Sequence, residues 1–109
     1  MAAFLLIESR DPFETETATR DYAELAHGLA ADGHAVAIFL VQNGVLPARP
    51  GARSQTLAAL VAAGVEVLAD DFSLKERGIA ATRLVTGVRA AAIDTVIERM
   101  AAGHKVIFH

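Results

Sequence analysis

The feature that most constrains the fold is a hydrophobic period that switches back and forth along the chain. Residues 2–7, 35–41 and 65–69 are short, mostly apolar runs of strand length, typical of strands covered on both faces. Across residues 17–32, and again after residue 54, apolar side chains recur every three or four positions, as on a helix. Strands that alternate with helices through short connections predict right-handed βαβ units. The expected fold is therefore α/β, with three α/β/α layers around a mostly parallel sheet of four or five strands.

Glycines and capping residues set the expected ends of these elements. Gly33 and Gly103 follow predicted helices at positions where the backbone turns left-handed. Ser54 is a predicted N-cap, and Ser73 followed three residues later by Glu76 has the spacing of a capping box.

The last third of the chain is less regular, and its elements are predicted from shorter patterns. Leu84 and Val85 are expected to form a short fourth strand. The apolar spacing from Ile93 to Met100 predicts the last helix, and residues 105–109 are expected to end the chain as a strand.

Length and charge narrow the class of protein. At 109 residues, 53% of them hydrophobic, the chain is expected to form one domain over residues 1–109. The net charge is −3 with interspersed signs, so nucleic acid is not expected as a partner. The longest apolar run, residues 35–41, is too short to span a bilayer, so no membrane partner is expected. The first run follows Met1 without basic residues and is interpreted as a strand, which makes the cytoplasm the expected location.

The chain has no cysteine. This excludes disulfides, thiolate metal ligands, a cysteine nucleophile and a persulfide on this chain. The sequence also lacks the dinucleotide, nucleotide, nucleophile-elbow and zinc-protease motifs, so no cofactor and no metal are expected.

Polar residues at the predicted strand ends define where a site would lie, because parallel α/β sheets bind ligands beyond the carboxyl ends of their strands. The residues expected at this edge are Ser9-Arg10, Gln42-Asn43-Gly44, Asp70-Asp71 and His109. His34 and His104 precede strands and belong to the opposite edge, so they are poor candidates for a metal site with the aspartates.

The adjacent aspartates, Asp70 and Asp71, allow three interpretations. In the first, Asp71 or Ser73 caps the following short helix. In the second, the pair binds a metal ion or a phosphate through it. In the third, one aspartate is the general base or metal ligand of a small hydrolase or transferase. Successive side chains of an extended strand point to opposite faces, so the pair acts together only if the backbone turns between them.

The ordered segments of the whole chain resemble the DsrE/DsrF-like family, small α/β proteins of sulfur-relay systems that include the TusD-type carriers. The resemblance rests on the apolar first strand and on four further segments: DPFETETATRDYAELAHGLAADGHAVAIFL, QNGV, GVEVLADDFSLKERGI and HKVIFH. It implies a flavodoxin- or Rossmann-like sheet and assembly into homo-trimers or hexamers.

The resemblance also implies a role for one position. Sulfur-carrying members have a cysteine eight residues before the glycine of an Arg-Gly pair, and counting back from Gly78 gives Asp70. The chain is thus interpreted as a member without the carrier thiol, acting as a binding or scaffold subunit, with sulfur-handling proteins as expected partners. If the pocket instead takes a small ligand, the residues expected to line it are Asp70, Asp71, Ser73, Arg77, Asn43 and Arg10.

Self-association is also expected from the residues themselves. The last strand, residues 106–108, runs almost to the final residue and would be held by a sheet or by another subunit. Val45 and Leu46 in the second loop are expected to add exposed apolar surface that a partner could cover.

Overall fold

The structure is a computed structural model that describes residues 1–10, 16–49 and 55–109, except for the side chains of residues 16–20. The predicted cap Ser54 lies outside the described residues. The strands are β1 (Ala3–Glu8), β2 (Ala35–Leu40), β3 (Glu66–Asp70), β4 (Val88–Ala91) and β5 (Lys105–Phe108). The helices are α1 (Glu16–Ala31), the 3-10 helix η1 (Gln42–Ala48), α2 (Gln55–Ala62), α3 (Asp71–Glu76) and α4 (Asp94–Ala101).

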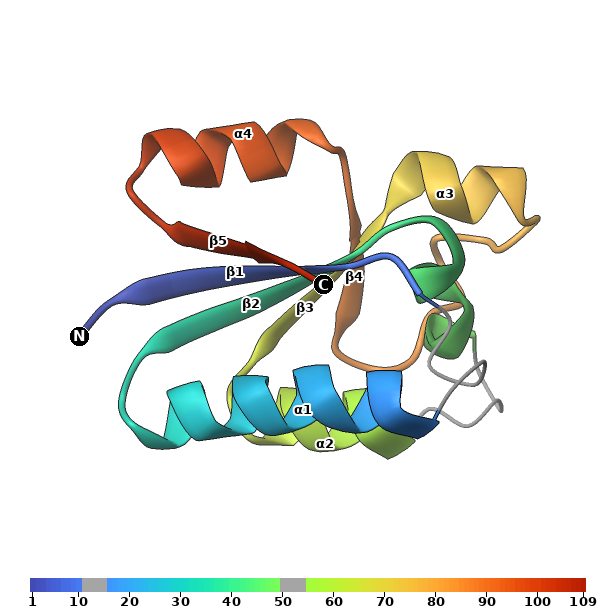
Figure 1. Cartoon of the computed structure of the whole chain (residues 1–109). Coiled ribbons are helices and arrows are strands. Elements are labelled where there is room, and N and C mark those ends of the chain that lie inside the picture. Colours follow the sequence, from blue (N-terminus) through green and yellow to red (C-terminus); the bar gives the residue numbers. More distant parts are fainter. Residues whose placement is uncertain (11–15, 50–54) are drawn as a thin grey trace.

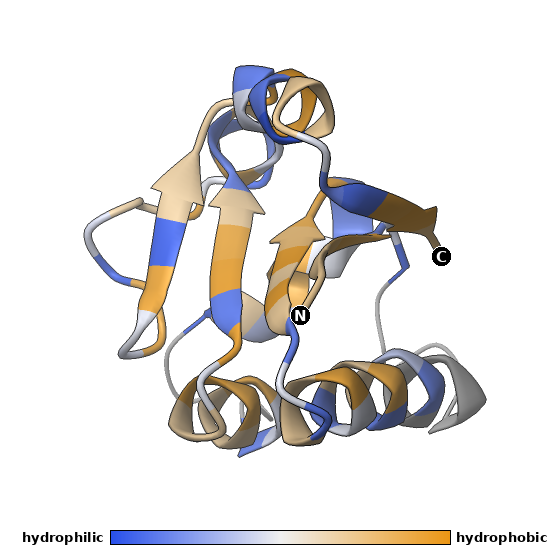
Figure 2. Cartoon of the chain, turned by 90° about the vertical axis from the view of Figure 1, so that its left-hand side faces the viewer, coloured by the Kyte–Doolittle hydropathy of each residue, from blue (hydrophilic) through white to orange (hydrophobic). Residues whose placement is uncertain are grey.

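The five strands form one sheet in the order β4-β3-β2-β1-β5, and every pair is parallel. Helices α1 and α2 lie on one face of the sheet and α4 on the other, while α3 follows β3 beyond its carboxyl end (Figure 1). The predicted three-layer α/β fold is confirmed. Figure 2 shows the hydrophobic pattern from which strands and helices were predicted: the strands are mostly apolar along their length, whereas the helices alternate polar and apolar stretches.

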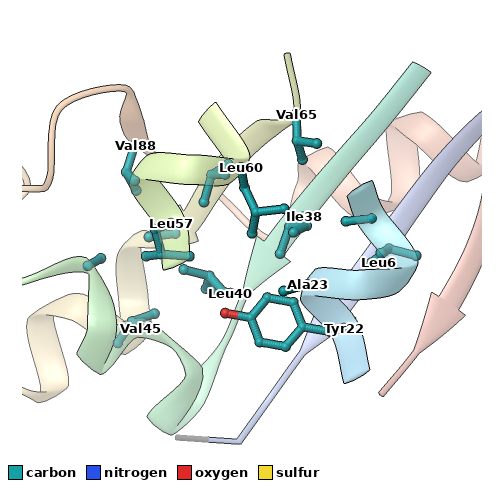
Figure 3. Packing of buried hydrophobic residues seen from close by; sticks show 14 of the residues in the cluster. Leu6, Tyr22, Ala23, Ile38, Leu40, Val45, Leu57, Leu60, Val65 and Val88 are labelled. Carbon is teal, nitrogen blue, oxygen red and sulfur yellow. The ribbon is translucent and has the colours of Figure 1, made fainter. Parts of the chain in front are cut away.

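Two apolar clusters fill the spaces between the layers. The larger one packs the sheet against α1 and α2, and Figure 3 shows Tyr22, Ile38, Leu57 and Leu60 within it. The smaller one contains Phe39 and lies on the α4 face, where α4 contributes only Val96 as a buried residue. One face of the sheet is therefore much less thickly covered than the other.

The fourth strand was predicted in the wrong place. Leu84 and Val85 form no strand; they pack against the larger cluster, and the backbone N–H of Val85 donates to Ala48 O at 2.9 Å. Gly87 then turns the chain with a φ of +93°, and β4 begins at Val88. The apolar pair is thus buried by covering the sheet, which gives the same sequence pattern as a short strand.

Val45 was also wrongly predicted to be exposed. Its side chain is fully buried in the larger cluster, and Leu46 is partly buried, because η1 folds back onto the sheet. Gly33 and Gly103 have the predicted left-handed backbone, with φ of +87° and +91°. Within the described residues, no helix has the length and apolar character needed to cross a membrane.

Candidate functional site

All five strands are parallel, so their carboxyl ends lie along one edge of the sheet. Residues that directly follow β1, β2 and β3 are thereby brought to this carboxyl edge, among them Arg10, Asn43 and Asp71, while Asp70 is the last residue of β3. The predicted shared edge for these residues is confirmed at the level of the backbone (Figure 1).

Asp70 is the N-cap of α3. Its Oδ2 accepts hydrogen bonds from the backbone N–H of Ser73 at 3.1 Å and from the Ser73 hydroxyl at 2.6 Å. The sequence analysis predicted Asp71 or Ser73 as the N-cap, and both predictions are wrong. The cap is the residue before Asp71. The reason is that β3 extends through Asp70 and α3 starts without a connecting loop, so the strand's last side chain reaches the helix donors.

Ser73 joins this cap to the neighbouring strand. Its Oγ accepts a hydrogen bond of 2.8 Å from the backbone N–H of Gln42, the first residue of η1. Gln42 has a φ of +53°, a left-handed backbone that is uncommon for a residue other than glycine. Asp70 and Ser73 are both buried, so Asp70, Ser73 and Gln42 form a hydrogen-bonded chain that links the ends of β3 and β2.

Arg77 and Asn43, both predicted to line the pocket, contact each other, a pairing that the sequence did not predict. Nε and Nη2 of Arg77 donate to Oδ1 of Asn43 at 3.1 and 3.0 Å, and Nη1 donates to Ser73 O at 3.1 Å. Glu76 is within 3.9 Å of the same guanidinium. The hydrogen bonds of Arg77 therefore connect α3 to η1, and its charge is directed at these partners.

The remaining two predicted site residues take no part in this network in the described structure. Asp71 is the half-buried first residue of α3, and its charge is placed favourably for the helix dipole. Arg10 is exposed, and its backbone N–H donates to the carboxylate of Glu8 at 3.1 Å.

A pocket of about 360 Å³ opens at this edge on the α4 side. We call it the edge pocket. Two carboxylates, Asp70 and Glu76, line it together with polar Gln42 and Ser73. Its other walls are apolar: Ile7, Val41, Phe72, Ile93 and Phe108. Phe72, Ile93 and Phe108 are 64%, 52% and 70% exposed, so the pocket rim is apolar and open to solvent.

Gly44 allows the loop after β2 to lie against the end of β1. A Cβ atom at this position would be 2.3 Å from the carbonyl oxygen of Glu8. The same carbonyl accepts a 3.0 Å hydrogen bond from the N–H of Val41. Only glycine lets η1 approach β1 this closely, and η1 in turn carries Gln42 and Asn43.

Glu8 also belongs to this edge, although it was not among the predicted site residues. Its side chain is 1% exposed, and its Oε2 lies 2.5 Å from Nδ1 of His109, the neighbour of the last strand. Tyr22 lies on the same side, where burial, and secondarily the charge of Glu8, raises the pKa of its hydroxyl well above the ordinary value. The sequence signal for Glu8 was an acidic residue at the end of an apolar run. Its contact with His109 could not be predicted, because the two residues are 101 positions apart in the chain.

The opposite, amino edge of the sheet carries its own polar network. Nδ1 of His34 accepts from the N–H of Ala2 at 3.0 Å. Arg99 donates to Glu66 at 2.6 Å and Arg89 also pairs with Glu66. The hydrogen bond from Arg99 holds the pKa of Glu66 below its ordinary value, and Arg89 adds to the effect. In residues 1–10, 16–49 and 55–109, no group of three or more His, Asp or Glu residues is arranged to hold a metal ion.

The fold and the edge pocket define a class: a three-layer α/β protein whose parallel sheet has a pocket with polar and apolar walls beyond its strand ends, and which has no cysteine. The sequence matches the DsrE/DsrF-like family over residues 2–108, and the chain belongs to that family.

Solved structures agree with this assignment at the level of the fold. The chain superimposes on the YchN protein of E. coli with a TM-score of 0.85 and 19% identity, covering 100% of both chains. MTH1491 of Methanobacterium thermoautotrophicum, a protein of unknown function, gives 0.89 and 18% identity, again with 100% of both chains covered. BT1422 of Bacteroides thetaiotaomicron, also of unknown function, gives 0.72 and 16% identity over 96% of this chain and 94% of the other. No curated protein sequence matches this chain significantly.

Proposed function

We propose that this chain is a binding subunit of the DsrE/DsrF-like family that holds a ligand in the edge pocket and carries no sulfur itself. The observation that carries the proposal is the composition of this pocket: two carboxylates, no cationic side chain, and an apolar rim. A chain without cysteine cannot form the persulfide of a carrier. The pocket beside Asp70 is then available for binding.

The lining selects the chemistry of the ligand. Asp70 and Glu76 favour an amine or another cationic hydrogen-bond donor, and Arg77 does not oppose it because its guanidinium is directed at Asn43 and Ser73 O. The exposed rings of Phe72 and Phe108 favour an aromatic or aliphatic body next to that charge. We therefore propose a ligand that joins an apolar group to a positive charge, either a small molecule or part of a partner protein.

A binding role is preferred to catalysis by Asp70 because, among the described residues, the two hydrogen bonds that its carboxylate accepts both come from Ser73 at the start of α3. Asp71, the second candidate base, is the first residue of α3, and its carboxylate accepts no hydrogen bond from the described residues. The roles of Asp70, Asp71, Ser73, Arg77, Asn43 and Arg10 in ligand binding, the sulfur-handling partners and the cytoplasmic location all stay predictions.

The test compares three probes of similar size: 2-phenylethylamine, 2-phenylethanol and 3-phenylpropanoate. Titrations followed by NMR or calorimetry at low ionic strength should show the amine binding at least about tenfold more tightly than the alcohol, a difference of about 1.4 kcal/mol. Asp70→Asn should remove most of that preference, since asparagine can still accept the Ser73 hydrogen bonds without the charge. Asp32→Asn is the matched control, because Asp32 is exposed and lies at the opposite edge.

Equal binding of the amine and the carboxylate by the wild-type protein would contradict the proposal. So would an equal loss in Asp70→Asn and Asp32→Asn, because the effect would then come from the overall charge.

We also propose that the chain forms a homo-oligomer, a trimer or hexamer, through the α4 face. Five of the large apolar side chains that are exposed belong to this side or to the pocket rim: Phe72, Ile93, Ile97, Met100 and Phe108. Ile93, Ile97 and Met100 form one stripe along α4, which is the only helix among the described residues on this face of the sheet (Figure 1). Burial of such a stripe by a second copy would stabilise association.

Light scattering after size exclusion measures this directly. The wild-type protein should elute at a multiple of its 11.5 kDa mass, and Ile97→Glu should shift it toward the monomer. A wild-type protein that is monomeric at about 100 μM would argue against this interface, because stable interfaces have dissociation constants far lower than that concentration.

A further inference from the structure

A second pocket, separate from the edge pocket, is lined by two arginines. Its volume is about 410 Å³, and its lining residues are Arg49, Gly78, Ile79, Ala80 and Arg83. We call it the arginine pocket. It lies between the end of η1 and the segment that follows α3, two parts of the chain joined by the hydrogen bond from the N–H of Val85 to Ala48 O. It shares no lining residue with the edge pocket.

The two arginines of this pocket differ in their partners from three other described arginines. Arg77, Arg89 and Arg99 each pair with a glutamate. For Arg49 and Arg83, by contrast, no carboxylate partner is found within the described ranges. Nε of Arg49 donates to Leu46 O at 3.0 Å, a bond that orients the guanidinium. Among the described residues no acceptor is found for its two terminal nitrogens.

The local charge is positive although the protein as a whole is acidic. Between residues 75 and 83 the chain has three cations, Lys75, Arg77 and Arg83, and a single acid, Glu76, and Arg49 adds a fourth cation from the end of η1. The net charge of the whole chain is −3. Two like charges that line one pocket repel each other, and a bound anion would turn that repulsion into attraction.

We propose that the arginine pocket binds the phosphate group of a small phosphorylated molecule, or free phosphate. Guanidinium groups match phosphate oxygens in pairs, and two of them can hold a dianion from two sides. Gly78 and Ala80 carry little or no side chain, so a phosphate can approach the backbone closely, and Ile79 offers an apolar contact to an organic substituent. The volume accommodates a phosphate with such a substituent.

The test uses inorganic phosphate, glycerol 3-phosphate and glycerol in calorimetric or phosphorus-NMR titrations at low ionic strength, where screening is weakest. The wild-type protein should bind both phosphates and not glycerol. Arg49→Gln and Arg83→Gln should each weaken phosphate binding by about tenfold or more. Arg89→Gln is the matched control, because Arg89 is exposed, lies on β4 and does not line this pocket; the phosphate affinity should change by less than about twofold.

The two phosphates distinguish the source of the ligand: tighter binding of glycerol 3-phosphate indicates a phosphorylated molecule, and equal binding indicates free phosphate. The proposal is overturned if the wild-type protein binds neither, or if Arg89→Gln weakens binding as much as the pocket variants do. If Arg49→Gln unfolds because it loses the bond to Leu46 O, Arg83→Gln decides alone, and unchanged affinity in that variant overturns the proposal.

Discussion

Gly44→Ala gives the sharpest test of how the carboxyl edge is built. The added Cβ would lie 2.3 Å from the carbonyl oxygen of Glu8 and 3.1 Å from its carbonyl carbon, so η1 and β1 must separate by about 1 Å to reach ordinary contact. Both segments are held by hydrogen bonds, Val41 N–H to Glu8 O at 3.0 Å and Gly44 N–H to Val41 O at 2.9 Å. The separation would therefore strain or break the first of these bonds.

The expected magnitude follows from three contributions. Overpacking costs about 1–3 kcal/mol, and the weakened Val41–Glu8 hydrogen bond about 1 kcal/mol more. Replacing glycine by alanine restricts the unfolded chain, which offsets about 0.4–1 kcal/mol. Gly44→Ala should thus lower the free energy of unfolding by about 1–3.5 kcal/mol.

Gly28→Ala is the matched control, since it makes the same chemical change inside α1. Its Cβ would have no neighbour within 4 Å, so only helix propensity acts, and the variant should be more stable by about 0.5–1 kcal/mol. Urea denaturation measures both values. The reasoning is refuted if Gly44→Ala is as stable as the wild type, or if the two substitutions change stability in the same direction.

Three further predictions concern individual polar side chains. Ser73→Ala should lower the free energy of unfolding by about 2–3 kcal/mol in urea titrations. The substitution removes the hydroxyl that donates to Asp70 and leaves the backbone N–H of Gln42 without its acceptor. A loss below about 0.5 kcal/mol would contradict this prediction. Tyr22→Phe should raise the melting temperature, because the Tyr22 hydroxyl is buried with no hydrogen-bond partner in the described structure. Glu66 has a pKa held below its ordinary 4.5, so its contribution to stability is complete above that pH and is lost as the pH falls through the lower folded-state value. The melting-temperature difference between wild type and Glu66→Gln should therefore shrink from pH 7 to pH 3, and a constant difference would count against the ion pair.

The candidate site could be predicted from the sequence only in part. The edge on which Asn43, Asp70 and Arg77 gather followed from the parallel sheet, because strand direction alone assigns each strand end to an edge. Which of these side chains touch could not be derived, since Ser73 and Gln42 are 31 residues apart and Arg77 and Asn43 are 34 apart. Such contacts depend on the angle at which η1 and α3 leave the sheet.

The sequence by itself determined the α/β class, the parallel sheet and the glycine-terminated helices, because these depend on apolar spacing and backbone freedom within a few residues. Only the tertiary structure decided that Asp70 rather than Asp71 caps α3, that Val45 is buried and that Leu84 and Val85 cover the sheet. It also decided that Arg49 and Arg83 line one pocket. The physical reason is that an apolar or charged residue has the same local pattern whether it packs, caps or binds, and only the segments folded against it determine which.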